Sequence, residues 1–315
     1  MRGWKRWLVV TVAFVSLGMG VVVDPSLAAG GAEAAGSTPW WVWPVVLFFF
    51  CFVLGIIAVL AGVGGGVLYV PLVSGFFPFH LDFVRGAGLL VALAGALAAG
   101  PGLLRRNLAS LRLALPVAVI ASSCAIVGAF MGLALPTNVV QICLGGTIVF
   151  IAILLLTSKN VERPQVLKQD AVGMALGMSG VYQEYSGEMV QWKTHRTVTG
   201  LLLFILVGVM AGMFGLGAGW ANVPILNLLM GVPLKIAVGT SKFLLSITDT
   251  SAAWVYMNQG CVIPLMAIPS IVGLMLGSFV GVRLLAVAKP KMIRYLVIGV
   301  LLFAGLRSLW KGLGL

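Results

Sequence analysis

Two copies of a glycine-rich break constrain this chain most strongly. Residues 62–71 read GVGGGVLYVP and residues 215–224 read GLGAGWANVP, with five of the ten positions identical. Both copies interrupt long apolar runs. Glycines inside a membrane helix interrupt its backbone hydrogen bonds, and the freed groups need other partners. Such a break is tolerated only where the backbone is buried in protein or lines a water-filled cavity. A matching pair of breaks, one in each half, is the pattern expected around the binding site of a secondary transporter.

The composition places those breaks in a membrane protein. Of the 315 residues, 61% are hydrophobic and 9% are charged, and the mean hydropathy is +1.12. A soluble domain has roughly a quarter of its residues charged. Repeated apolar runs predict an all-α polytopic membrane protein with about 8–10 membrane segments, each of roughly 20 residues. We expect it to be a multi-pass protein of a bacterial plasma (inner) membrane.

The chain divides into five parts. Residues 1–28 combine a basic start, an apolar stretch and small residues, which predicts a secretory signal peptide or an uncleaved first membrane helix. Residues 29–42 then form an extracytoplasmic linker. The remaining parts are a first membrane repeat at 43–157, a cytoplasmic connection at 158–198 with a short hairpin, and a second membrane repeat at 199–315.

The positive charges predict the orientation of these repeats. Basic residues concentrate at 105–112, 159–196 and 283–294, whereas the loops at 136–138 and 258–262 have none. Because basic loops stay in the cytoplasm, the two halves are predicted to have inverted topology. Arg85, Arg307 and Lys311 depart from the pattern. The net charge of +12 is thus explained by basic loops beside a lipid bilayer, which we expect to be the partner, and not by binding to nucleic acid.

Two ionisable residues inside one apolar run are candidates for function. Lys242 and Asp249 are seven residues apart, so they share a helix face but are separated by roughly 10 Å of rise. We expect Lys242 to attract an anion, with Thr240 and Ser241 as hydrogen-bond donors. Asp249 either couples transport to protons or offsets the lysine charge. The structural alternative is that Lys242 extends to the membrane surface or pairs with a carboxylate elsewhere.

The helix starts after the two breaks would direct backbone amides at the same anion. The further residues expected to line the site are Gly64, Gly65, Gly66, Gly217, Gly219, Trp220 and Asn222. No catalytic residues, metal ligands or cofactor are expected. The four cysteines lack CxxC spacing, the two histidines are far apart, and the glycine runs lack the lysine of a phosphate-binding loop. His80, Asp82 and Arg85 are expected either to gate entry to the site or, as the simpler interpretation, to form a surface ion pair.

The paired breaks, the downstream Val-Pro and the triplet Gly239-Thr240-Ser241 resemble the sulfite exporter TauE/SafE family from about residue 45 to 310. The resemblance implies an inverted-repeat carrier of small sulfur-containing anions such as sulfite, sulfoacetate and other organosulfonates, held between the halves. In the first half, Gly86-Ala87-Gly88 replaces the hydroxyl-bearing triplet usual in the family. An ion channel, or a proton- or cation-coupled carrier using Asp249, is the alternative, and a homo-oligomer stays open.

Overall fold

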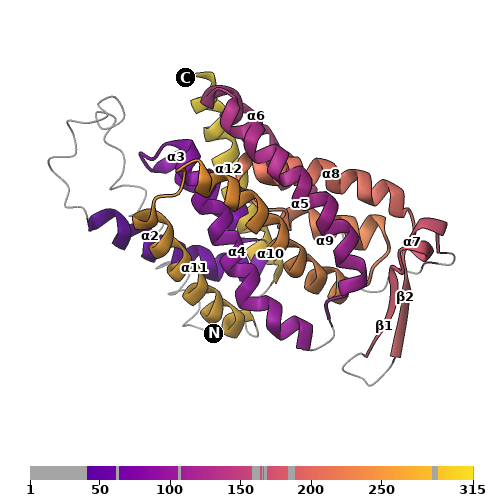
Figure 1. The fold of residues 1–315 in the computed structure, drawn as a ribbon. Helices are drawn as coiled ribbons and strands as arrows, with labels where there is room; N and C mark the ends of the chain where they lie inside the picture. The colour runs from indigo at the N-terminus through magenta and orange to yellow at the C-terminus, as the bar shows by residue number, and fades with distance from the viewer. Residues whose placement is uncertain are drawn as a thin grey trace.

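The computed structural model describes residues 41–61, 64–105, 108–157, 164, 166, 169–183, 189–285 and 290–314. Within these residues the protein is a bundle of long apolar helices with one small hairpin (Figure 1). It is an all-α polytopic membrane protein, as predicted. The predicted signal peptide and almost all of the 29–42 linker lie outside the described residues.

The helices repeat in the two halves. The first half contains α2 (Val42–Ala61), α3 (Gly65–Phe76), α4 (Leu81–Arg105), α5 (Leu111–Ala134) and α6 (Thr137–Thr157). The second contains α8 (Thr197–Phe214), α9 (Gly219–Pro224) with a π-helical turn η3 (Ile225–Leu229), α10 (Leu234–Asn258), α11 (Pro264–Leu285) and α12 (Pro290–Leu313). Adding 153, the spacing of Gly62 and Gly215, to the first residues of α4, α5 and α6 gives those of α10, α11 and α12. Both α11 and α12 begin with proline, which is tolerated there because the first helical amide has no partner within the helix.

The two halves are joined through small residues. A Cβ atom built on Gly273 or Gly277 of α11 would collide with the backbone of α2 at Phe48 or Phe52. In the same way, Gly208 and Gly212 of α8 lie against the backbone of α5 at residues 121 and 125. Glycines at these positions let the helices approach closely enough for Cα–H···O contacts. Close packing of this kind holds membrane helices together, because lipid provides no hydrophobic driving force for their association. Each half therefore contributes one helix to each of two mixed pairs, α2 with α11 and α5 with α8.

The contacts also define the helix directions. In both mixed pairs, the residue numbers of the two contacting helices increase in the same direction, so the helices are parallel. The equivalent helices α4 and α10 are antiparallel, because Arg85 lies over Tyr256 while Ser110, just beyond α4, bonds to Thr240. The equivalent helices α6 and α12 are antiparallel as well. These directions are those expected for halves of opposite orientation, although the inverted topology across a membrane stays a prediction.

Five helical stretches are long and apolar enough to cross a membrane by length and composition: Leu81–Ala98, Leu111–Ala134, Thr137–Thr157, Thr197–Phe214 and Pro264–Gly281. This number, which covers the described residues, is below the predicted 8–10. The helix α10 is not among the five, because lysine, aspartate and hydroxyl side chains replace apolar ones along it.

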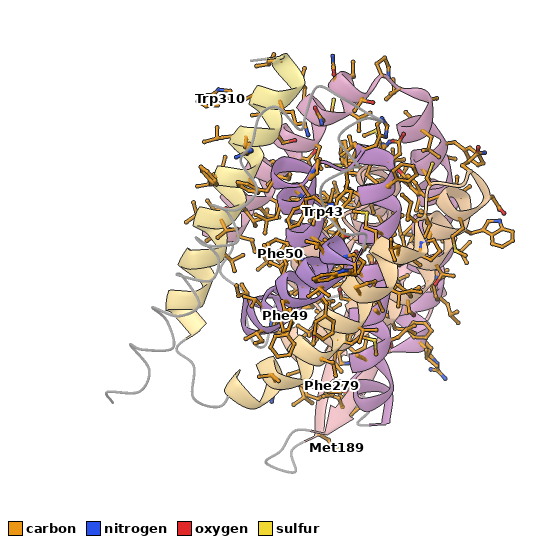
Figure 2. The ribbon with its side chains drawn as sticks, turned by 90° about the vertical axis from the view of Figure 1, so that its left-hand side faces the viewer. Trp43, Phe49, Phe50, Met189, Phe279 and Trp310 are labelled. Atoms are coloured by element: carbon orange, nitrogen blue, oxygen red, sulfur yellow. The ribbon has the colours of Figure 1, made fainter. Side chains whose placement is uncertain are left out.

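Large apolar side chains cover the outside of the bundle. Phe49, Phe279 and Trp310 are each more than half exposed, at 53%, 56% and 68%. Figure 2 shows Trp310 near one end of the bundle and Met189, on the hairpin, at the other. An apolar exterior of this extent indicates a lipid-facing surface.

Two of the basic residues that depart from the charge pattern have structural partners. The Lys311 Nζ donates a hydrogen bond to the Ser74 carbonyl oxygen (3.0 Å), and the Arg307 guanidinium lies 4.3 Å from the centroid of the Phe76 ring. Ser74 and Phe76 belong to the last turn of α3, where carbonyls have no partner within the helix and the dipole attracts positive charge. The two charges therefore stabilise a helix end.

The connection between the halves contains the short helix α7 (Ala171–Ala175) and the antiparallel strands β1 (Ser179–Gln183) and β2 (Met189–Lys193). These paired strands form a short hairpin in the connection, as expected, and the residues between them, 184–188, lie outside the described residues. Asp170 anchors this unit to α8, since its carboxylate accepts hydrogen bonds from the Thr197 amide (2.8 Å) and hydroxyl (2.7 Å). Figure 1 shows the hairpin projecting from one end of the helices.

Candidate functional site

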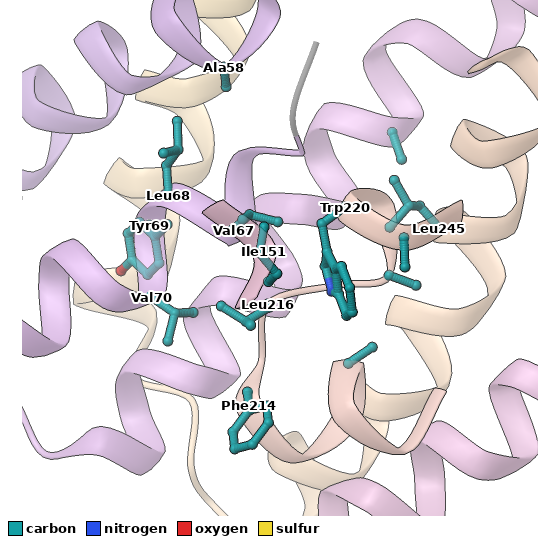
Figure 3. Close-up of a cluster of buried hydrophobic side chains, with 14 of the residues drawn as sticks. Ala58, Val67, Leu68, Tyr69, Val70, Ile151, Phe214, Leu216, Trp220 and Leu245 are labelled. Carbon is teal, nitrogen blue, oxygen red and sulfur yellow. The ribbon is translucent and has the colours of Figure 1, made fainter. Parts of the chain in front are cut away.

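The two glycine breaks lie against each other inside the protein. A Cβ atom on Gly219 would lie 3.6 Å from the Cα atom of Gly64, and one on Gly66 would lie 2.6 Å from the Leu216 carbonyl oxygen. Figure 3 shows Val67 and Leu216, which adjoin the breaks, in one buried cluster with Trp220. The structure therefore brings together segments that are far apart in sequence and come from opposite halves.

Backbone conformation explains why these positions are glycine. Gly215 and Gly217 have φ angles of +69° and +70°, which a residue with a Cβ atom rarely adopts. Gly215 ends α8, and its amide donates to the Ala211 carbonyl oxygen (3.0 Å). Gly64 precedes α3 in an extended conformation and has no side chain that could cap the first amides of that helix.

Asp249 of α10 lies directly at the second break. Its side chain is fully buried, and a Cβ atom on Gly217 would lie 2.9 Å from Oδ2. Neither carboxylate oxygen has a hydrogen-bond partner of normal geometry in the described part of the chain. The Ala218 amide and the Lys242 ammonium are near enough to act on the carboxylate electrostatically. An uncompensated carboxylate at such a position is expensive, which makes it a functional candidate.

Lys242 lies on the same face of α10 as Asp249, two turns nearer the start of the helix. Its side chain is partly buried, and among the described residues it makes neither a salt bridge nor a hydrogen bond. Leu245, which lies between them in sequence, packs 3.1 Å from where a Cβ atom on Gly219 would lie. Among the described residues, the lysine and the aspartate therefore share one face of α10 without forming a salt bridge.

Three further buried polar groups in this region have no hydrogen-bond partner within the described residues: Trp220 Nε1, both amide atoms of Asn222, and Thr248 Oγ1. Trp220 and Asn222 are on α9, immediately after the second break, and Thr248 adjoins Asp249 on α10. The Trp220 ring makes an edge contact with Phe150 of α6, with centroids 6.4 Å apart. Buried polar groups are normally satisfied, so this concentration indicates a place for polar ligand or solvent atoms.

Thr240 has a different environment from the rest of the predicted site. Its hydroxyl accepts a hydrogen bond from the Ser110 amide (3.1 Å), which ties α10 to the start of α5. Two residues before Lys242, it lies on a nearly opposite face of the helix. Ser241, which is also buried, lies between these two faces. Ligand binding by Thr240 and Ser241 stays a prediction.

The predicted ion pair forms, since Asp82 pairs with both His80 and Arg85, but the Arg85 side chain is buried and not at the surface. This side chain on α4 is 1% exposed and donates hydrogen bonds to the carbonyl oxygens of Gly132 (3.0 Å) and Met213 (2.9 Å) while pairing with Asp82. The Tyr256 hydroxyl donates to Gly212 O (3.0 Å), in the same last turn of α8. Arg85 and Tyr256 therefore hold the end of α8 immediately before the second break. An arginine in an apolar run, against the charge pattern, was the signal in the sequence.

Replacing Arg85 by methionine is expected to lower the free energy of unfolding by ~3–5 kcal/mol, because Asp82 and two buried carbonyls lose their partner. The measurement is thermal unfolding of the purified protein in detergent. Arg112→Met is the matched control, because Arg112 is exposed at the start of α5. Equal melting of the two variants would contradict the structural role of Arg85.

A sequence model of known families decides the family. The model described as "Sulfite exporter TauE/SafE" matches residues 47–308 of the chain. The chain belongs to the sulfite exporter TauE/SafE family. The matched region includes both glycine breaks, α10 with Lys242 and Asp249, and the connection between the halves.

Two proteins similar to this TauE/SafE chain are named as probable membrane transporters. The chain is 24% identical over 276 residues to "Probable membrane transporter protein YunE" of Bacillus subtilis (strain 168), covering 85% of this chain and 98% of that protein. It is 30% identical over 108 residues to "Probable membrane transporter protein YdhB" of the same organism, covering 34% of this chain and 43% of that protein. No solved structure matches. The protein is therefore a multi-pass bacterial membrane transporter.

Proposed function

We propose that the protein is a secondary transporter of small sulfur-containing anions, such as sulfite, sulfoacetate or other organosulfonates, working by alternating access. The observation that carries the proposal is the crossing of the two glycine breaks against α10, whose Lys242 has no ion pair among the described residues. An unpaired lysine on a helix that packs against two broken segments is suited to hold an anionic group. The name of the family supports sulfite and chemically similar anions.

The anion would be held from both halves. Lys242 supplies positive charge, and the amides of Gly65 and Gly66 at the start of α3 supply hydrogen-bond donors. Trp220 Nε1 and Asn222 Nδ2 are buried donors without a partner in the described region, and they would complete the coordination of sulfonate oxygens. Because each group belongs to a different segment, relative motion of those segments would open the site to one side at a time.

We infer a carrier and not an enzyme, because the relatives are described as membrane transporters. The second candidate is a channel or a cation carrier, favoured by the buried Asp249 carboxylate. Dependence of flux on substrate concentration separates these. A carrier saturates, whereas a channel at the same concentrations does not.

The test is uptake of labelled anions into vesicles containing the purified protein. The panel holds sulfite, sulfoacetate and methanesulfonate, with sulfate and acetate for comparison and protein-free vesicles as the blank. We expect saturable uptake of at least one of the first three, exceeding that of acetate. Uptake of none of them above the blank would contradict the proposed substrates, and uptake that rises linearly with concentration would contradict a carrier.

A further inference from the structure

Asp249 and Lys242 lie two turns apart on α10. The carboxylate contacts the glycine backbone of the second break at Gly217, while Lys242 lies beyond Leu245, two turns away along α10. Leu245, one turn after Lys242 on α10, packs against the crossing point at Gly219. One small ligand bound at Lys242 would therefore leave the Asp249 oxygens still without a partner.

The surroundings of Asp249 are nearly free of other charges. From α4, the neighbour at the same glycine is Ala92, whose Cβ would lie 3.2 Å from a Cβ atom on Gly217. The second break contributes backbone, including the Ala218 amide, and the adjacent residue on α10 is Thr248 with a buried hydroxyl. Among the described residues, Lys242 is the titratable group that acts on the carboxylate. A buried carboxylate in these surroundings needs a cationic partner that fits beside glycine backbone.

Charge balance identifies that partner. With Lys242 charged and Asp249 ionised, the empty site is neutral. A monovalent anion at Lys242 would leave one uncompensated negative charge in the interior, which a low-dielectric medium strongly disfavours. A proton on Asp249 cancels this charge, so the loaded site is neutral as well. A carrier must reorient in both states, and both are then free of net charge.

We propose that Asp249 is the proton-binding site of this carrier, separate from the anion site at Lys242, and that one proton moves with each monovalent anion. This inference rests on the proposed anion transport. The step forms one O–H bond between a proton from the aqueous phase on one side and an Asp249 oxygen, and breaks it by releasing the proton on the other side. A proton requires a single carboxylate oxygen, whereas a sodium ion would need several oxygen ligands around it.

The first arm of the test needs no substrate. Infrared difference spectra of the purified protein across a pH series detect the carbonyl stretch of a protonated carboxylic acid. We expect a titrating carboxylic acid band in the wild type that is lost in Asp249→Asn and kept in Asp82→Asn, with size-exclusion chromatography confirming that each variant is folded. Identical bands in wild type and Asp249→Asn would overturn the proton site. Loss of the band on adding sodium at constant pH would overturn the choice of a proton.

The second arm measures accumulation of methanesulfonate, whose charge is fixed at minus one, in vesicles with an imposed proton gradient and the membrane potential held at zero. One-proton coupling predicts ~10-fold accumulation per pH unit in the wild type, and no accumulation in Asp249→Asn. Accumulation by Asp249→Asn equal to that of the wild type would overturn coupling through Asp249. A titrating Asp249 band without flux of any anion in the panel would reject the proposed substrates and keep the proton site. Saturable anion flux without a titrating Asp249 band would keep the proposed substrates and reject the proton site.

Discussion

Replacing Lys242 by methionine is expected to weaken the apparent affinity for the transported anion by roughly 30-fold or more, with the fold retained. Methionine keeps the length of the side chain and removes its charge. Losing one partner of a desolvated charge pair typically costs ~2–5 kcal/mol. Because the described residues provide Lys242 with no ion pair or hydrogen bond, its removal breaks no internal contact of that kind. The measurement is the concentration dependence of anion uptake into vesicles.

The same substitution at Lys235 is the matched control. Lys235 lies two turns earlier on α10 and is exposed. We expect Lys235→Met to retain wild-type uptake. Unchanged half-saturation in Lys242→Met would remove the lysine from the anion site. It would leave the glycine breaks as the remaining candidates.

Replacing Gly277 by leucine is expected to prevent stable assembly of the helix bundle. A Cβ atom at this position would overlap the backbone carbonyl of Phe52, so α2 and α11 would have to separate along their whole contact. Overpacking of a tight interface usually costs ~1–3 kcal/mol, and here the obstacle is backbone, which has no alternative rotamer. The loss of close approach also removes the contacts that hold membrane helices together. The measurement is the yield of monodisperse protein on size-exclusion chromatography and its melting temperature.

Gly146 provides the control for Gly277. It is exposed on α6, and a Cβ atom there would meet nothing within 4 Å. Gly146→Leu is expected to assemble normally. If Gly277→Leu assembles equally well, the small-residue contact is not what joins the two halves.

The repeat allowed most of the fold to be predicted from the sequence. The predicted first residues of the two membrane repeats, 43 and 199, lie within two residues of the starts of α2 and α8, because apolar runs begin there. The π-helical turn at 225–229 was not predictable, since its pattern of residues resembles that of an ordinary helix end. The pairing of helices between halves was also not predictable, because every helix is apolar on several sides.

The candidate site was predictable where chemistry conflicts with the membrane. Charged residues in an apolar run identified Lys242 and Asp249, and the structure places Asp249 against Gly217 of the second break. The role of Lys242 in binding stays a prediction. Arg85 is also a charged residue in an apolar run. Its position near a helix start suggested a place at the surface, whereas the structure buries it. The role of Thr240 in bonding Ser110 depends on a contact between segments 130 residues apart, which local sequence does not reveal.

The exchange of partners between the halves has a consequence for biosynthesis. The glycine contacts of α2 are made with α11, which is synthesised after every other helix of the described chain except α12. Until then, the early helices must remain in the bilayer with the surfaces that will later be covered still facing lipid or a chaperone. Assembly thus becomes cooperative only near the end of translation, and a chain truncated before α11 would lack the partner of its first described helix. Such a chain would be a natural substrate for membrane quality control.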